Sequence, residues 1–191
     1  MRNIFYRHKA LMLLVIVFFF IKSPISSEEF EYKLKAEFIE RFTRFIDWPA
    51  SSSVPHSDIP FDICITGTNP FGEYLTALAR NVKIKNKLVR VRDVSRTEEI
   101  DSCNVLFISK SEASHLPAIL EKISDRPILS VADTPGYAEK GVLINFYRSG
   151  NYVRFEINSA AVQKSGLRFS SRLLKLARLV DTPPLTQESF R

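Results

Sequence analysis

Hydrophobic residues recur at spacings of three and four over residues 28–46, which predicts one apolar stripe of an α-helix. The pair Trp48-Pro49 is predicted to end this helix. Residues 50–60 are rich in Ser and Pro without periodicity, which is typical of a loop. The stripe consists of Phe30, Leu34, Phe38, Phe42, Phe45 and Ile46.

Short apolar runs then alternate with helical stretches. One helix is predicted to follow the turn over 69–72 and to end near Arg80, and another to run over 111–124. The run 105–108 has no polar interruption, which suits a strand that is covered on both faces. The run 87–94 alternates loosely and predicts an edge or half-buried strand. The predicted strands of this part are 61–66, 87–94, 105–108 and 127–132.

The C-terminal part begins with two predicted strands, 141–148 and 152–157, which a short connection containing Gly joins into a hairpin. A last helix is predicted over 159–180, with Gly166 as a break and Pro183-Pro184 as its stop. This order predicts an α/β fold, with a twisted, largely parallel sheet flanked by helices on both faces and a C-terminal β-hairpin and helix.

The N-terminus has the three-part layout of a secretory signal peptide. Basic residues precede an uncharged apolar run over 10–21, and small residues follow over 23–27. This run is shorter than the roughly 20 residues that a membrane-spanning helix needs. We predict that residues 1–27 are a cleaved signal peptide, that 28–191 fold as a single domain, and that no stable membrane insertion remains after cleavage.

Removal of the leader changes the charge of the chain. The full sequence has 27 Lys and Arg against 21 Asp and Glu, a formal net charge of +6. Four of the bases lie in the leader and no acid does, so the mature chain is nearly neutral. A nucleic-acid partner is therefore not predicted, because binding to nucleic acid would need clustered Lys and Arg side chains to neutralise the phosphates.

Cys64 and Cys103 are the only cysteines, and both lie in the mature chain. An oxidising compartment favours an intramolecular disulfide between them, which would stabilise the fold by about 4 kcal/mol. Two buried, unpaired thiols are the alternative. In a sheet of this type the first strand commonly lies between its two successors. The strand that carries Cys64 and the strand that begins at Cys103 are therefore predicted to be neighbours.

The sequence contains no recognisable catalytic motif. His56 and His115 are isolated and fit no zinc spacing, and no nucleophile elbow, Walker loop or kinase-type set occurs. The Gly-containing loop 67–72 could meet an anion, although a structural turn that starts a helix is the commoner use of such a loop. We predict no enzymatic activity, no cofactor and no metal site. Four acids are scattered without an identifiable partner, and most of them are predicted to be solvated or capping: Asp62, Asp93, Asp133 and Glu156.

Polar residues occupy one face of the last predicted strand. The alternation places Arg154, Glu156 and Asn158 on that face, where they could bind a ligand or partner or form a solvated sheet face. The chain also contains 15 Phe, 6 Tyr and 1 Trp, and aromatic residues are enriched at protein interfaces. The candidate partner- or ligand-binding residues are Arg154, Glu156, Asn158 and Trp48.

An ordered set of motifs resembles one family, the periplasmic YfiR-like proteins. No single motif is diagnostic, but their order and spacing are fairly specific and extend over nearly the whole mature chain. The motifs are FIDWP at 45–49, ICITG at 63–67, PFG at 70–72, CNVLFIS at 103–109, VAD at 131–133, RFEIN at 154–158 and LRFSSRLLKLA at 167–177.

The resemblance implies a non-enzymatic regulator in the periplasm. Such a protein dimerises and inhibits an inner-membrane diguanylate cyclase by binding its periplasmic sensor part, so that redox or envelope stress releases cyclic-di-GMP synthesis. Cys64 and Cys103 match a disulfide position of this family, whereas a second disulfide of some members has no counterpart here. A redox-sensing role that needs the second bond is not implied.

A second hypothesis is a periplasmic small-ligand binding module that is accessory to a sensor or transporter. Its binding site would use the loop 67–72 and the face that carries Arg154.

Overall fold

The computed structural model describes residues 27–56 and 58–181. The predicted signal peptide, apart from Ser27, and the Pro183-Pro184 stop lie outside these residues. The chain divides into two units, Met1–Phe30 and Glu31–Arg191, and the fold described below is that of the second. Among the described residues, no helix is both long and apolar enough to cross a membrane.

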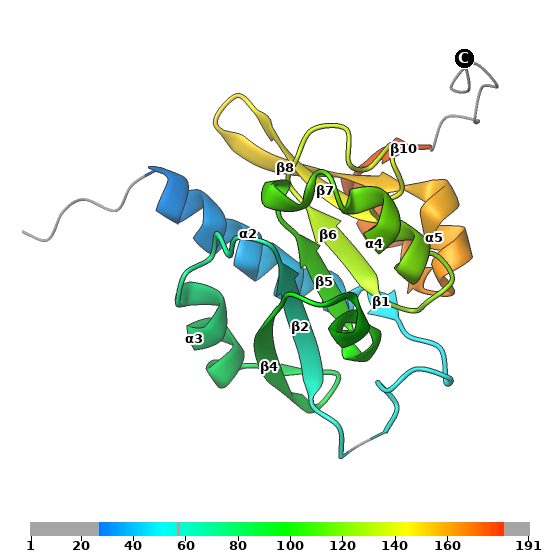
Figure 1. Ribbon diagram of the computed structural model, residues 1–191. Coiled ribbons are helices and arrows are strands. Elements are labelled where there is room, and N and C mark those ends of the chain that lie inside the picture. The colour runs from blue at the N-terminus through cyan, green and yellow to red at the C-terminus, as the bar shows by residue number, and fades with distance from the viewer. Residues whose placement is uncertain (1–26, 57, 182–191) are drawn as a thin grey trace, which may run out of the picture. The chain divides into compact units, whose positions relative to one another are not determined.

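An eight-stranded sheet in the order β10-β8-β7-β6-β5-β2-β4-β3 forms the centre of the fold (Figure 1). The pairs β4–β2, β2–β5, β5–β6, β6–β7 and β8–β10 are parallel, whereas β7–β8 and β3–β4 are antiparallel. The predicted α/β fold with a largely parallel sheet and a hairpin is thereby confirmed. The strands are β2 (Phe61–Thr66), β3 (Lys83–Ile84), β4 (Lys87–Val94), β5 (Val105–Ile108), β6 (Leu129–Ala132), β7 (Ile144–Ser149), β8 (Tyr152–Asn158) and β10 (Arg178–Val180).

Helices cover both faces of the sheet, as predicted. Alternate residues of β5 show this, because Val105 and Phe107 join one core cluster while Leu106 and Ile108 join the other. The first cluster includes apolar residues of α2 and α3, and the second includes those of α4. The helices are α2 (Ser27–Arg44), α3 (Tyr74–Asn81), α4 (Leu116–Ile123), α5 (Ser159–Ser165) and α6 (Ser171–Leu176), with 3-10 turns η1 (Thr97–Ser102) and η2 (Lys110–Glu112).

The first predicted helix exists as α2, but it ends earlier and buries a different set of side chains. Phe42 is buried as expected, whereas Phe45 is 36% exposed. Lys35 and Glu40 are buried although both are charged. Lys35 pairs with Glu31 and Asp133, and Glu40 pairs with Arg44. These ion pairs compensate the buried charges, and the spacing of apolar residues does not predict them. After α2 the chain enters β1 (Ile46–Asp47), which pairs antiparallel with β9 (Arg168–Phe169).

The single helix predicted over 159–180 is wrong. The break at Gly166 is confirmed, since this residue caps α5 with a φ of 73°. Beyond it the chain forms β9, then α6, whose N-cap Ser170 accepts a hydrogen bond from Leu173 N at 3.3 Å, and finally β10. Pairing of β9 with β1 and of β10 with β8 overrides the helical apolar pattern.

Strand β3 was not predicted, and it places β4 inside the sheet rather than at its edge. The alternative of a half-buried strand is confirmed, because the residues of β4 range from buried to exposed. A two-residue turn joins the two strands through Lys85 and Asn86, with φ angles of 51° and 65°. Positive φ at both positions is the geometry of a hairpin turn that follows the twist of its strands. The sequence signal is weak because neither residue is Gly.

The predicted disulfide between Cys64 and Cys103 is present, and it closes a loop of 39 positions. The two Cα atoms lie 5.9 Å apart. Strand β2 lies between β4 and β5, which confirms the predicted adjacency of the strand with Cys64 and the strand that follows Cys103.

Candidate functional site

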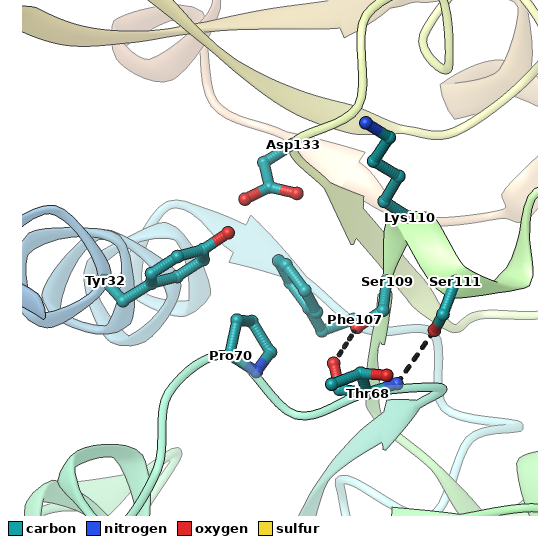
Figure 2. A pocket seen from close by; sticks show the side chains of 8 residues that line it. All are labelled: Tyr32, Thr68, Pro70, Phe107, Ser109, Lys110, Ser111 and Asp133. Carbon is teal, nitrogen blue, oxygen red and sulfur yellow. Dashed lines mark hydrogen bonds between the residues drawn. The ribbon is translucent and has the colours of Figure 1, made fainter. Parts of the chain in front are cut away.

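The candidate site is a pocket at the carboxyl ends of β2 and β5. From β2 the chain passes through α3 to β4 on one side, and from β5 it passes through α4 to β6 on the other. Such a switch point leaves a crevice in which ligands of open α/β sheets bind. A cavity of about 460 Å³ occupies this position (Figure 2). Its lining residues are Tyr32, Thr68, Pro70, Phe107, Ser109, Lys110, Ser111 and Asp133.

Two loops that meet closely form one side of the pocket. Thr68 N donates to Ser111 Oγ at 2.8 Å, and Ser109 Oγ donates to the carbonyl of Thr68 (Figure 2). Gly67 permits this approach, because a Cβ atom there would lie 2.3 Å from Ser111 Oγ. Its φ of 83° also favours glycine. The loop predicted from its glycines is thus part of the pocket.

Aromatic side chains form the apolar wall of the pocket. Phe107 of β5 is fully buried and meets Phe71 edge-to-face, with ring centroids 4.7 Å apart. The ring of Tyr32 in α2 also meets Phe71 edge-to-face, with ring centroids 5.6 Å apart. Pro70 lies beside Tyr32 in the close view (Figure 2). These contacts hold the wall in place without a ligand.

Charged groups at the pocket are compensated unequally. Asp133 Oδ2 accepts a hydrogen bond from Lys35 Nζ at 2.7 Å, and the same ammonium pairs with Glu31 at 2.7 Å. Arg148 lies 3.3 Å from the second oxygen of Glu31. Lys110, by contrast, is exposed and makes no ion pair within the described part of the chain. The pocket therefore presents one uncompensated positive charge.

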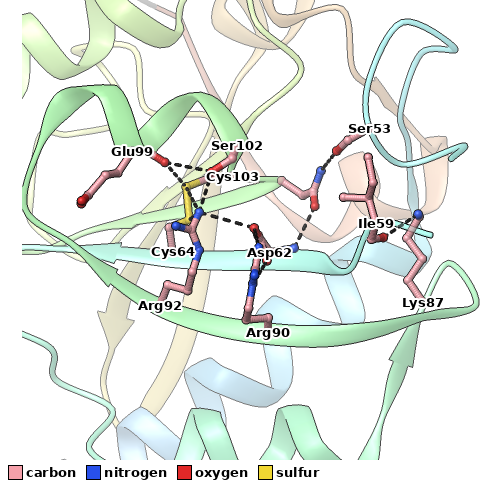
Figure 3. A network of polar contacts seen from close by, with 11 residues as sticks. Ser53, Ile59, Asp62, Cys64, Lys87, Arg90, Arg92, Glu99, Ser102 and Cys103 are labelled. Atoms are coloured by element: carbon pink, nitrogen blue, oxygen red, sulfur yellow. Dashed lines mark hydrogen bonds and ion pairs between the residues drawn. A yellow bond between two sulfur atoms is a disulfide. The ribbon is translucent and has the colours of Figure 1, made fainter. Parts of the chain in front are cut away.

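A separate polar network surrounds the disulfide (Figure 3). Asp62, only 2% exposed, accepts two hydrogen bonds of 2.7 Å from Arg90, and these bonds raise the pKa of Arg90. Arg92 Nη2 lies 3.4 Å from Asp62 Oδ2 and 3.6 Å from the sulfur of Cys64. The network ties β4 to β2 and compensates a buried carboxylate, which is a structural role.

The same network anchors the loop before β2. Asn104 Oδ1 accepts from Asp62 N at 2.8 Å, and its Nδ2 donates to Ser53 Oγ at 2.9 Å. Lys87 Nζ donates to the carbonyl of Ile59 at 2.7 Å (Figure 3). It also donates to the carbonyl of His56. These bonds hold the Ser- and Pro-rich segment against the sheet.

The prediction that most of the four scattered acids are solvated or capping is wrong, because three of them are largely buried and paired. Asp62 and Glu156 are each 2% exposed, and the side chain of Asp133 is 10% exposed. Each has a cationic partner far away in sequence, and separation of this kind hides the pairing from sequence inspection. Asp93 alone among the four is exposed, and it accepts from Asn69 Nδ2 at 3.0 Å.

The polar row predicted on β8 is divided between the surface and the interior. Arg154 is exposed, and its guanidinium carbon lies 6.0 Å from the centroid of the Tyr152 ring. Glu156 accepts from Arg178 Nε at 3.1 Å and from Asn145 Nδ2 at 3.1 Å. The Glu156 carboxylate raises the pKa of Arg178. Glu156 is buried, so the alternative prediction of a solvated sheet face is wrong for this residue.

Asn158 and Trp48 are also enclosed. Asn158 is fully buried, donates to the carbonyl of Ala138 at 2.7 Å and accepts from Ala161 N at 2.7 Å as the N-cap of α5. Trp48 is 9% exposed and packs edge-to-face on Phe61 at 5.4 Å. A binding role for the four predicted residues stays a prediction, and of these four residues only Arg154 is exposed in the structure.

The aromatic wall, Lys110 and Asp133 were not predicted as parts of the site. A usable signal was the position of the polar residues, because Thr68, Ser109 and Asp133 follow closely on strands β2, β5 and β6. Carboxyl ends of neighbouring parallel strands meet at one edge of a sheet.

A family model described as YfiR/HmsC-like matches residues 32–178. The matched region includes both cysteines and every residue that lines the pocket. The chain belongs to the YfiR/HmsC-like family. The resemblance noted in the sequence is thereby confirmed. YfiR/HmsC-like proteins are periplasmic regulators of a non-catalytic kind, and at this level the chain is a periplasmic regulator.

Comparison with solved structures finds similarity at low sequence identity. One is the ABC domain from Streptococcus pneumonia in complex with L-Trp, which is 13% identical with a TM-score of 0.50. That match covers 78% of this chain and 60% of the streptococcal chain. A conserved domain protein from Vibrio cholerae O1 biovar El Tor is 10% identical with a TM-score of 0.48, over 78% of this chain and 59% of that chain. This YfiR/HmsC-like chain thus spans about 60% of the length of the first structure, and the likeness concerns the fold alone.

Proposed function

We propose that this protein binds the periplasmic sensor part of an inner-membrane diguanylate cyclase and inhibits cyclic-di-GMP synthesis. Family membership over residues 32–178 is the observation that carries the proposal. The protein reaches the periplasm through its cleaved leader, acts without enzymatic activity or cofactor, and works as a homodimer. Sedimentation equilibrium of the exported protein tests the dimer, which should have twice the mass of one chain rather than a single-chain mass at every concentration.

The exposed tip of the β7–β8 hairpin supports a role in partner binding. Tyr152 is 71% exposed and lies under the guanidinium of Arg154. Tyr and Arg are enriched among the residues that dominate binding energy at interfaces. We therefore place Arg154 and Tyr152 in the surface that contacts the cyclase.

Crosslinking in the periplasm tests this function. The tagged, exported protein should capture a membrane protein that contains a diguanylate cyclase domain, and Arg154→Ala with Tyr152→Ala should reduce capture at least fivefold. Arg172→Ala is the matched control, because Arg172 is an exposed arginine on α6. Capture that never includes a cyclase would contradict the proposal, and equal loss in both arginine variants would contradict the assigned surface.

Binding of a small ligand is a second candidate function, which the pocket at the switch point between β2 and β5 favours. The protein would then act as an accessory to a sensor or transporter. A thermal-shift screen against periplasmic metabolites separates this candidate from the first, since a ligand that binds only the folded state raises its unfolding temperature. The cyclase capture experiment is independent of this screen.

A further inference from the structure

We propose that the pocket between the ends of β2 and β5 binds a small organic anion with a flat ring. The proposal deepens the second candidate function and rests on it. A cavity of about 460 Å³ is within the range of small-molecule sites and holds one ring with a short side chain. Three features of the lining define the ligand: an aromatic wall, one uncompensated cation and hydroxyl groups.

The aromatic wall selects a flat apolar body. Phe71 makes edge-to-face contacts with both Phe107 and Tyr32, and these contacts hold the two rings in place. Figure 2 shows Tyr32, Pro70 and Phe107 around the same space, with each ring contributed by a different segment. Tyr32 and Pro70 are half-buried, so a ligand ring placed against them gains ring contact and removes apolar surface from water, whereas Phe107 is fully buried and offers no surface to water.

The charge balance selects an anion. Asp133 reaches the pocket, but its carboxylate is already paired with the buried ammonium of Lys35 at 2.7 Å. Among the lining residues of the described chain, Lys110 is then the charge without an ionic partner. A carboxylate or phosphate on the ligand would compensate Lys110, whereas a second cation would be repelled by it.

Hydroxyl groups orient the remaining polar atoms of the ligand. Ser111 Oγ accepts the N–H of Thr68 at 2.8 Å and keeps its own proton for donation. The hydroxyl of Thr68 lies beside it at the base of the pocket, away from the ammonium of Lys110 (Figure 2). An oxygen or ring nitrogen on the ligand can accept from these groups while the anionic group meets Lys110.

Three simple probes test the proposal on protein purified after export. Calorimetry compares 3-phenylpropionate, its neutral amide 3-phenylpropanamide, and propionate, which lacks the ring. We expect the ring acid to bind about fivefold more tightly than the amide, because the amide loses the contact with Lys110. Propionate should bind at least tenfold more weakly than the ring acid, because it lacks the apolar body.

Variants locate the effect. Lys110→Gln should remove the preference for the acid over the amide, whereas Lys164→Gln, at an exposed lysine of α5, should keep it. Tyr32→Leu should weaken both ring compounds equally. Amide chemical-shift changes caused by the ring acid should centre on residues 68 and 109–111.

Two results would overturn the inference: an acid preference that survives Lys110→Gln, or shift changes that centre elsewhere. A neutral or cationic metabolite found in the thermal-shift screen would refute the anionic class but leave ligand binding in place. No ligand of any class would remove the second candidate function itself, and cyclase capture would remain a separate test of the first.

Discussion

At the scale of single residues, Gly67 joins the two loops of the pocket. Its φ of 83° and the 2.3 Å approach to Ser111 Oγ are two separate requirements for glycine. Gly136 has nearly the same φ, 82°, but no heavy atom lies within 4 Å of its hypothetical Cβ. A side chain at Gly136 would therefore meet only backbone strain, whereas one at Gly67 would meet backbone strain and a steric clash.

Gly67→Ala should lower the free energy of unfolding by about 2 kcal/mol, and Gly136→Ala by about 1 kcal/mol. Both variants carry the cost of positive φ, while the first also disturbs the hydrogen bond from Thr68 N to Ser111. Urea unfolding measures both values. Equal losses would show that the two loops do not need their close contact.

Lys35 compensates the charge of Asp133, the largely buried acid of the pocket. Lys35→Met should lower the free energy of unfolding by about 3 kcal/mol, because Asp133 then lacks its partner at a largely buried position. The double variant Lys35→Met with Asp133→Leu should recover a substantial part of this loss in urea unfolding.

Lys122→Met serves as the control for the buried pair. Lys122 pairs with Asp101 at 3.0 Å, but the two side chains are 26% and 43% exposed. Its loss should change the free energy of unfolding by less than about 1 kcal/mol. A similar cost at both lysines, without recovery in the double variant, would mean that Lys35 contributes only through its hydrocarbon chain.

At the scale of elements, the disulfide joins β2 to the segment before β5. Reduction should lower the free energy of unfolding by about 4 kcal/mol, because a loop of 39 positions is released in the unfolded chain. Thiol titration of the exported protein should find no free thiol, and the variant Cys64→Ala with Cys103→Ala should be insensitive to reductant. Two reactive thiols before reduction would contradict both the bond and export.

Strands were predictable where apolar runs and chain order decide the structure. The runs at β2, β4 and β5 and the place of β2 between its successors follow from local pattern and from the sheet rule. The C-terminal segment was not predictable, because β9 and β10 form only by pairing with β1 and β8. Strand β1 lies far from β9 in the sequence, and helices α5 and α6 separate β8 from β10.

The pocket was predictable only in part, for the same physical reason. The glycine loop was visible in the sequence, but its partner residues Tyr32, Lys110 and Asp133 come from three distant segments. Ion pairs such as Lys35 with Asp133, which are 98 positions apart, arise from the tertiary fold. Periodicity and composition carry no information about such distances.

At the scale of the whole molecule, the features described above lie in distinct regions of one sheet. The disulfide and the Asp62 network lie toward the amino ends of β2 and β5, and the pocket lies at their carboxyl ends. The β7–β8 hairpin extends from the sheet (Figure 1). Tyr152 and Arg154 of this hairpin are exposed. The proposed ligand pocket and the proposed partner surface are therefore separate regions of this YfiR/HmsC-like protein.

Cellular cyclic-di-GMP measures the central claim most directly. Deleting the gene should raise the cyclic-di-GMP level, and expressing the exported protein should return it to the starting level. A version without residues 1–27 should fail to do so, because the protein would not reach the compartment of the sensor part. An unchanged level after deletion, or full restoration by the version that is not exported, would contradict the account.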